Sequence, residues 1–194
     1  MEQHSQTSDT LESRRILEGQ LRECYGRVVY SHKTHEKCAD ILIQRQAVIK
    51  ITQIALSALT ASGFIVAIFT SVTPVAIVGA IVSGTLLALN AYTKDYDLGA
   101  LAQKHKQAAN DIWMIRERYL SLMVDLAMGQ QPLEAIQVER DKLSDELHSI
   151  YEGSPSTTYQ AYRKAQAALK TQEDMTFSDE EIDKLLPPEL KRTG

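Results

Sequence analysis

The stretch between Lys50 and Lys94 decides the fold. It reads ITQIALSALTASGFIVAIF over residues 51–69 and VAIVGAIVSGTLLALNAY over residues 75–92. Charged residues make up 24% of the chain, yet none lies between those two lysines. As a helix, the first run rises about 28 Å, close to the roughly 30 Å hydrocarbon core of a bilayer, and the second run is of similar length. The two runs therefore predict two transmembrane helices.

Residues 70–74 between the runs form a short uncharged connector, and Pro74 suits the first turn of the second helix. Such a short connector makes the two helices antiparallel neighbours. Basic residues lie on both flanks and none lies in the connector, which by the positive-inside rule predicts a multi-pass membrane protein with both termini in the cytoplasm. The flanking basic residues are Lys37, Arg45, Lys50, Lys94, Lys104 and Lys106. The polar N-terminus carries no cleavable signal pattern, so we expect the hairpin itself to direct insertion.

An alternative is that the hairpin is the buried core of a water-soluble helical bundle, as in toxins that unfold onto membranes. The flanking helices each offer only one narrow apolar stripe, which they need for each other. This argues against the soluble alternative.

Polar and small residues within the spans are candidates for helix packing or for a pore. Gln53 and Asn90 lie at the same predicted depth near the cytoplasmic boundary, where they either bond to each other, or are wetted, or line a pore after oligomerisation. Small residues at four-residue spacing mark faces where helices approach closely, so self-association is expected. The candidates of this kind are Ser57, Ala61 and Gly63 in the first span and Gly79, Ala80, Ser83, Gly84 and Ala88 in the second.

The flanks continue the hairpin as a stalk of two paired helices with a coiled-coil heptad pattern. The stalk positions with three- and four-residue spacing are Leu21, Val28, His35, Cys38 and Leu42 before the first span and Leu98, Leu101, His105, Ile112, Ile115, Tyr119 and Leu122 after the second. Asp9 and Glu12 resemble a capping box at the start of the stalk, and Gly129 with Pro132 ends its outgoing helix.

No strand pattern appears in the sequence, so the predicted class is all-α: a two-helix transmembrane hairpin with long cytoplasmic helical extensions. The predicted parts are an N-terminal tail (1–10), a cytoplasmic helix (11–50), the first span (51–69), a non-cytoplasmic loop (70–74), the second span (75–92), a cytoplasmic heptad helix (93–128), two further cytoplasmic helices (132–152 and 156–172), and an amphipathic turn and tail (173–194). Ser178 and Glu181 predict a capping box in that tail.

The sequence contains no catalytic motif, so we expect neither an enzyme nor a cofactor. His32, His35 and Cys38 are the best metal candidates, but helical His and Cys residues are more often packing residues. A pH-responsive layer of His35 and His105 is a further hypothesis. Trp113 is interpreted as a packing aromatic, with a phosphate site shared with Arg116 and Arg118 as the alternative. The interspersed charges give no reason to expect direct nucleic-acid binding.

Two stretches resemble the SLATT family of two-transmembrane effector proteins. They are ADILIQRQAVIK at residues 39–50 and NAYTKDYDLGALAQKHKQAANDIWMIRERYLSL at residues 90–122, on either side of the double span. The resemblance implies an effector of prokaryotic antiviral defence that oligomerises and forms a pore or disrupts the inner membrane, causing abortive infection. It also implies a separately encoded partner: a cytoplasmic sensor, a nucleotide synthase or a reverse transcriptase.

The alternative function is a non-conducting membrane scaffold that recruits a cytoplasmic partner through its helical stalk. A hairpin without charged side chains need not conduct ions, so the sequence leaves both functions open. In either case the expected surroundings are membrane lipid and other copies of the chain.

Overall fold

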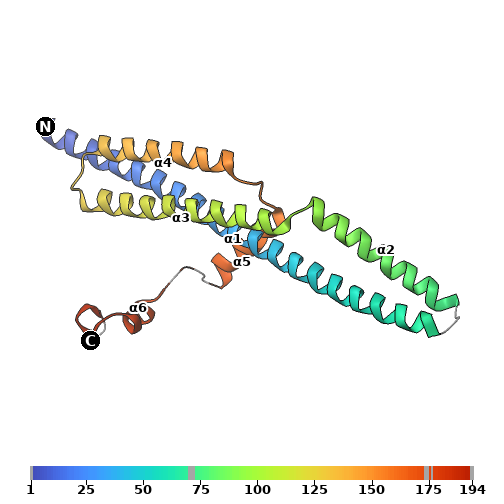
Figure 1. The fold of residues 1–194 in the computed structure, drawn as a ribbon. Helices are drawn as coiled ribbons and strands as arrows, with labels where there is room; N and C mark the ends of the chain where they lie inside the picture. Colours follow the sequence, from blue (N-terminus) through green and yellow to red (C-terminus); the bar gives the residue numbers. More distant parts are fainter. Residues whose placement is uncertain (1, 70–72, 173–174, 176, 193–194) are drawn as a thin grey trace.

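In the computed structural model, residues 2–69, 73–172, 175 and 177–192 are described, although the side chains of 2–9, 64–69, 73–75 and 188 are not. All secondary structure in this described part is helical, which confirms the predicted all-α class. The elements are α1 (Glu2–Phe69), α2 (Thr73–Asp95), α3 (Leu98–Met128), α4 (Leu133–Gly153), α5 (Tyr159–Thr171), α6 (Asp179–Leu185) and a 3-10 turn, η1 (Pro188–Leu190). Figure 1 shows that α1 runs almost the whole length of the molecule.

α1 is a single helix of 68 residues that serves both the stalk and the hairpin. No proline interrupts it, because the first proline of the chain is Pro74. The predicted N-terminal tail and the Asp9–Glu12 capping box were wrong, since the helix already begins at Glu2. The Glu12 carboxylate instead pairs with the Arg15 guanidinium one turn further on, at 2.9 Å, as on an ordinary helix surface.

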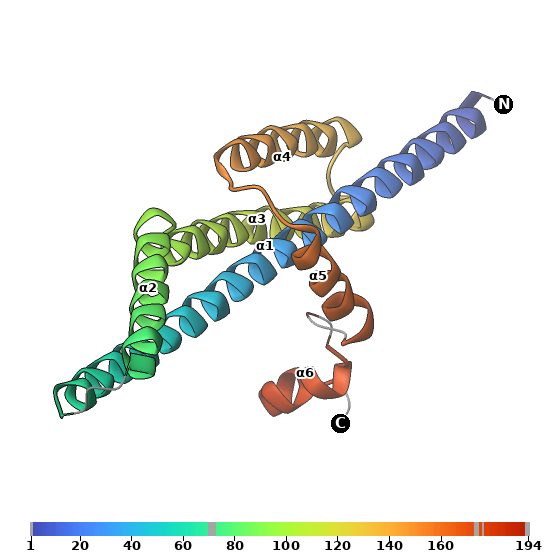
Figure 2. The ribbon, with the colours of Figure 1, turned by 90° about the vertical axis from the view of Figure 1, so that its right-hand side faces the viewer.

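α2 turns back along the end of α1, so the two helices lie side by side as an elongated hairpin (Figures 1 and 2). Of the predicted connector 70–74, residues 70–72 lie outside the described residues, while Thr73 and Pro74 form the first turn of α2. Within the described part, one helical stretch, which starts at Ala76, is long and apolar enough to cross a membrane, and its apolar window is entirely unburied. The side chains at the end of the first predicted span lie outside the described part.

The chain bends between α2 and α3, at Tyr96 and Asp97. The Asp97 carboxylate accepts a hydrogen bond from the Ala100 backbone N–H at 2.8 Å and caps α3. Next to the cap, Gly99 passes close to α1: a Cβ atom there would lie 2.8 Å from Gln46 Nε2. The bend and the close approach together lay α3 along α1.

The core of the molecule lies where α1, α3 and α4 meet. α3 makes its most extensive contacts with α1, and α4 covers α3 from the other side (Figure 2). The buried residues of this core are Leu17, Leu21, Val28, Ile112, Ile115, Tyr119, Leu122, Leu126, Ile136 and Leu143. α3 ends where Gly129 adopts a left-handed conformation with φ of 69°, at the position that the sequence predicted.

The last helices are arranged around the stalk. α5 packs on α1 through its buried alanines, Ala161, Ala165 and Ala168. α6 lies away from the helical bundle in Figures 1 and 2 and begins with the predicted capping box of Ser178 and Glu181.

Candidate functional site

The contact between the two arms of the hairpin follows a regular spacing. The half-buried positions recur every three or four residues and face the other arm: Gln53, Leu56, Thr60 and Gly63 on α1, and Gly79, Val82, Leu86, Leu89 and Thr93 on α2. Gly63 and Gly79 lie on this contact face, but a Cβ atom at either glycine would meet no atom within 4 Å. The arms are therefore in contact without being tightly interlocked at these glycines.

Gln53 and Asn90 meet at the base of the hairpin. Gln53 Nε2 donates to Asn90 Oδ1 at 2.9 Å and lies 3.3 Å from Thr93 Oγ1, a second acceptor. One hydrogen bond thus joins the two amides, which lie level with each other on the two arms. The same amide groups would be needed to line a pore. In this structure they are bonded to each other within one hairpin.

The other small residues of the hairpin face outward. Ser57, Ala61, Ala80, Ser83, Gly84 and Ala88 are exposed. With 100° per residue along a helix, Ala80, Gly84 and Ala88 lie on the face of α2 opposite Leu86, which packs against α1. Ala76 extends the same stripe, and Gly84 has open space above it. The hairpin thus leaves a smooth apolar face uncovered.

The stalk buries most of the residues with heptad spacing. Leu21, Val28, His35, Cys38, Leu98, His105, Ile112, Ile115, Tyr119 and Leu122 are buried, and Leu42 is half-buried. The exception is Leu101, which is 36% exposed, while Ala102 is 3% exposed and faces α1. The prediction for Leu101 was wrong, because the buried face of α3 runs from Leu98 to Ala102 and His105, a step of four residues followed by one of three.

His35 and His105 form a buried pair between α1 and α3. Their Nδ1 atoms are 3.0 Å apart, and each side chain is 3% exposed. Burial lowers the pKa of His35 to about 4, with further lowering from His105 and His32, and burial also lowers the pKa of His105. The close contact requires that one Nδ1 donates a proton and the other accepts it, so the pair is built for the neutral form.

Residues 17–181 match a family model described as SMODS and SLOG-associating 2TM effector domain family 4. The chain belongs to this family. The resemblance drawn from residues 39–50 and 90–122 is thereby confirmed. Searches among curated proteins and among solved structures found no match. The chain is accordingly a two-transmembrane (2TM) effector domain of defence systems, and its exposed apolar helix fits a membrane protein.

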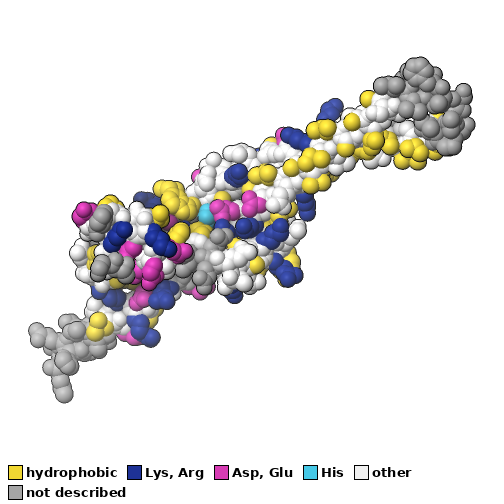
Figure 3. All heavy atoms as spheres, turned by 90° about the horizontal axis from the view of Figure 1, so that it is seen from below, with side chains coloured by type: hydrophobic (Ala, Val, Ile, Leu, Met, Phe, Trp, Pro, Cys, Tyr) yellow, Lys and Arg dark blue, Asp and Glu magenta, His cyan; other side chains and the backbone are white. Residues whose placement is uncertain are grey.

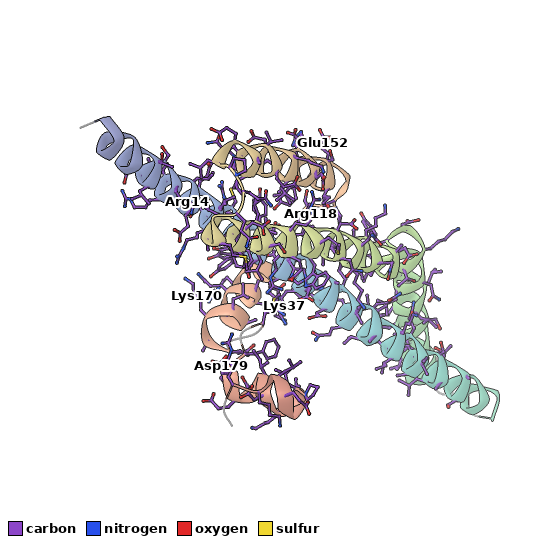
Figure 4. All side chains as sticks on the ribbon, turned by 90° about the vertical axis from the view of Figure 1, so that its left-hand side faces the viewer. Arg14, Lys37, Arg118, Glu152, Lys170 and Asp179 are labelled. Carbon is purple, nitrogen blue, oxygen red and sulfur yellow. The ribbon has the colours of Figure 1, made fainter. Side chains whose placement is uncertain are left out.

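This effector domain does not assemble the metal and phosphate sites that the sequence suggested. In the described residues no group of three or more His, Cys, Asp or Glu side chains is placed to hold a metal ion, which removes the His32, His35 and Cys38 candidate. The Arg118 guanidinium lies between α3 and α4 and binds Glu139 and Glu146 of α4 (Figure 4). Arg116 lies over the Tyr25 ring, and Trp113 is 42% exposed. These three residues therefore do not form a shared phosphate site.

Two features of the effector domain were missed at the level of sequence. Asp97 could have been found, because an Asp just before an apolar helical pattern is a common N-cap. The buried cluster around His32 could not have been found from the sequence. His32 and Lys33 are buried on α1, where burial lowers the pKa of His32 and the charges of Glu36, Arg116, Lys33 and Glu117 act on it. A buried lysine in a charged segment has no sequence signal, since it depends on what α3 places opposite.

Proposed function

We propose that this effector domain inserts its hairpin into the inner membrane, with both termini in the cytoplasm, and oligomerises there. When a signal from a separately encoded partner reaches the stalk, the assembly opens a pore or disrupts the bilayer, and the infected host loses viability. The partner would be a sensor, a nucleotide synthase or a reverse transcriptase.

The uncovered face of α2 supports this proposal best. In lipid, helices associate through close packing of small residues, because apolar burial gives little driving force there. The stripe of Ala80, Gly84 and Ala88 faces away from α1, so the hairpin does not use it for its own packing. It is free for a second copy of the chain.

The stalk supports the idea of a triggered assembly. α1 passes from the stalk into the hairpin without a break, so a change in how α1 packs on α3 is passed to the membrane segment. Two alternative packings of one pair of helices are the kind of element that a partner can shift.

The test is induced expression of Gly84→Leu together with Thr85→Leu as a control. Both positions are exposed on α2, and Gly84 has nothing within 4 Å of a Cβ atom, so the hairpin itself tolerates the leucine. We expect wild type and Thr85→Leu to crosslink into closed rings, to release dye from liposomes and to depolarise cells. Gly84→Leu should lose all three while remaining in the membrane fraction.

A scaffold is the second candidate function, and the Gln53–Asn90 bond favours it. The bond occupies the most polar side chains of the spans, so the hairpin has little hydrophilic lining to offer. A scaffold predicts toxicity with an intact membrane potential and crosslinked species no larger than a dimer with a bound partner. A cytosolic, detergent-free and monodisperse protein would contradict both functions.

A further inference from the structure

A groove lies beside the base of the hairpin, where α1, α2, α3 and α5 come together. It has a volume of about 390 Å³ and is lined by apolar side chains, among them Val48, Ile49 and Tyr92. Its polar side chains are Gln44, Lys164, and Arg45 and Gln160, which are hydrogen-bonded at 3.4 Å. A groove with an apolar wall and two cations suits an amphiphile with a negative head.

The position of the groove along α1 indicates that this amphiphile is a membrane lipid. At 1.5 Å per residue, Val48 lies about 4.5 Å and Arg45 about 9 Å before the first span begins at residue 51. The headgroup layer of a bilayer extends roughly 5–8 Å from the hydrocarbon core. An arginine at this distance reaches the layer with its long side chain. The apolar wall thus runs from the headgroup layer at Val48 to the edge of the hydrocarbon core at Tyr92, and the Arg45 guanidinium reaches the level of the phosphates.

The charges of the groove are available to a ligand. Arg45 and Lys164 are exposed, and in the described part of the chain neither has a carboxylate within salt-bridge distance. Of the two acidic residues between α2 and the start of α3, Asp97 uses its Oδ1 atom to cap α3 and Asp95 is exposed to solvent. The net character of the groove is therefore positive.

A pair of tyrosines at the base of the hairpin marks the same level as a membrane boundary. The rings of Tyr92 and Tyr96 stack with centroids 5.1 Å apart, and the two residues are 44% and 63% exposed. Exposed aromatic residues collect at the interface between hydrocarbon and headgroups. In Figure 3 the apolar surface of the hairpin gives way to Lys and Arg side chains toward its base.

We propose that this groove binds an anionic phospholipid of the leaflet on the stalk side, such as phosphatidylglycerol. The headgroup phosphate lies between Arg45 and Lys164, and an acyl chain lies against Val48 and Tyr92. The site ties α5 to the membrane surface, because Lys164 and Gln160 belong to α5. This inference rests on membrane insertion of the hairpin but not on pore formation.

The test uses the full chain purified in a non-ionic detergent, titrated with phosphatidylglycerol or with phosphatidylcholine of the same acyl chains. Bound lipids are counted by native mass spectrometry. We expect preferential binding of phosphatidylglycerol, which falls roughly fivefold for each cation removed by Arg45→Gln and Lys164→Gln. Arg163→Gln is the matched control, since Arg163 is exposed on the same helix but does not line the groove. Val48→Asp, at a position that is 63% exposed, should also weaken binding.

Three results would overturn the inference: equal binding of the two lipids, an equal loss in Arg163→Gln, or displacement of the lipid by millimolar inorganic phosphate. The last would show a site for soluble phosphate. Each of these leaves the chain in the membrane fraction. Failure of the proposed function differs, because it shows as a chain that partitions into buffer or that never permeabilises a bilayer. Unchanged helicity by circular dichroism confirms that the variants fold.

Discussion

The imidazoles of His35 and His105 contact each other through their Nδ1 atoms, 3.0 Å apart, where they are buried between α1 and α3. When both rings are neutral, one Nδ1–H donates a hydrogen bond to the other Nδ1. The bond can persist when one of the two rings becomes an imidazolium. A doubly protonated pair places two N–H groups and two charges against each other. We therefore expect the buried pair to make the stalk sensitive to acid.

The stalk should lose stability as the pH falls from 6.5 toward 4. The folded pKa of His35 lies near 4, below the ordinary value of 6.5, so the unfolded chain binds more protons within this window. The stability that depends on a neutral His35 is fully present above pH 6.5 and is lost as the pH falls from 6.5 to 4. The loss in the free energy of unfolding is on the order of 2–3 kcal/mol at pH 4. Chemical denaturation of the detergent-solubilised protein at several pH values measures it.

Substitutions distinguish the part of this pH dependence that comes from the His35–His105 pair from the part that comes from other titrating groups. His35→Leu combined with His105→Leu should flatten the slope between pH 6.5 and 4. His148→Gln should not, because His148 is exposed on α4 beside Glu152. His32 also contributes, with Glu36, Lys33, Arg116 and Glu117 acting on it, so some slope should remain. An undiminished slope in the double variant would contradict the prediction.

Removal of the Gln53–Asn90 bond should loosen the base of the hairpin by roughly 0.6–2 kcal/mol, the range for hydrogen bonds between membrane helices. Asn90→Leu should cost more than Thr93→Val, because the bond to Asn90 is 2.9 Å long and the one to Thr93 is 3.3 Å. A double-mutant cycle with Gln53→Leu, read by unfolding in mixed micelles, measures the coupling. No coupling between Gln53 and Asn90 would mean that both amides are solvated.

Arg118→Ala should release α4 from α3. Arg118 bridges Glu139 and Glu146, both on α4, and all three side chains are partly exposed, so the loss should be about 1–2 kcal/mol. Faster amide exchange in α4 than in α3 would show it. Arg22→Ala serves as the control, since Arg22 pairs with Glu18 within α1 and links no two helices.

One substitution, Gly→Ala, should act with opposite sign at two positions. Gly129→Ala should destabilise the chain by about 1 kcal/mol, because Gly129 has φ of 69°. Gly19→Ala should stabilise it by up to about 1 kcal/mol, because Gly19 lies inside α1 with open space around its Cβ position. Thermal unfolding compares the two, and the same sign at both sites would contradict the argument.

The sequence predicted those features that depend on local chemistry or on hydropathy. The all-α class, the end of α3 at Gly129 and the capping box of Ser178 could all be inferred, because each depends on neighbouring residues alone. The start of α1 was misplaced because Asp9 resembles a cap although the helix already runs past it. The Leu101 assignment failed because three- and four-residue steps are both compatible with a heptad pattern, and the larger Leu101 was preferred to Ala102, which packs in the buried face. The groove at Arg45 and Lys164 brings together two helices that are far apart in the chain, which periodicity does not show.

The two arms of the molecule differ in stiffness. α1 is one uninterrupted rod about 100 Å long, whereas the return arm is jointed at Tyr96 and Asp97. We expect a rotation of the far end of α1 to be passed along the helix toward the hairpin, because no break interrupts it. The break at Tyr96 and Asp97 lets α2 follow that movement while α3 keeps its place.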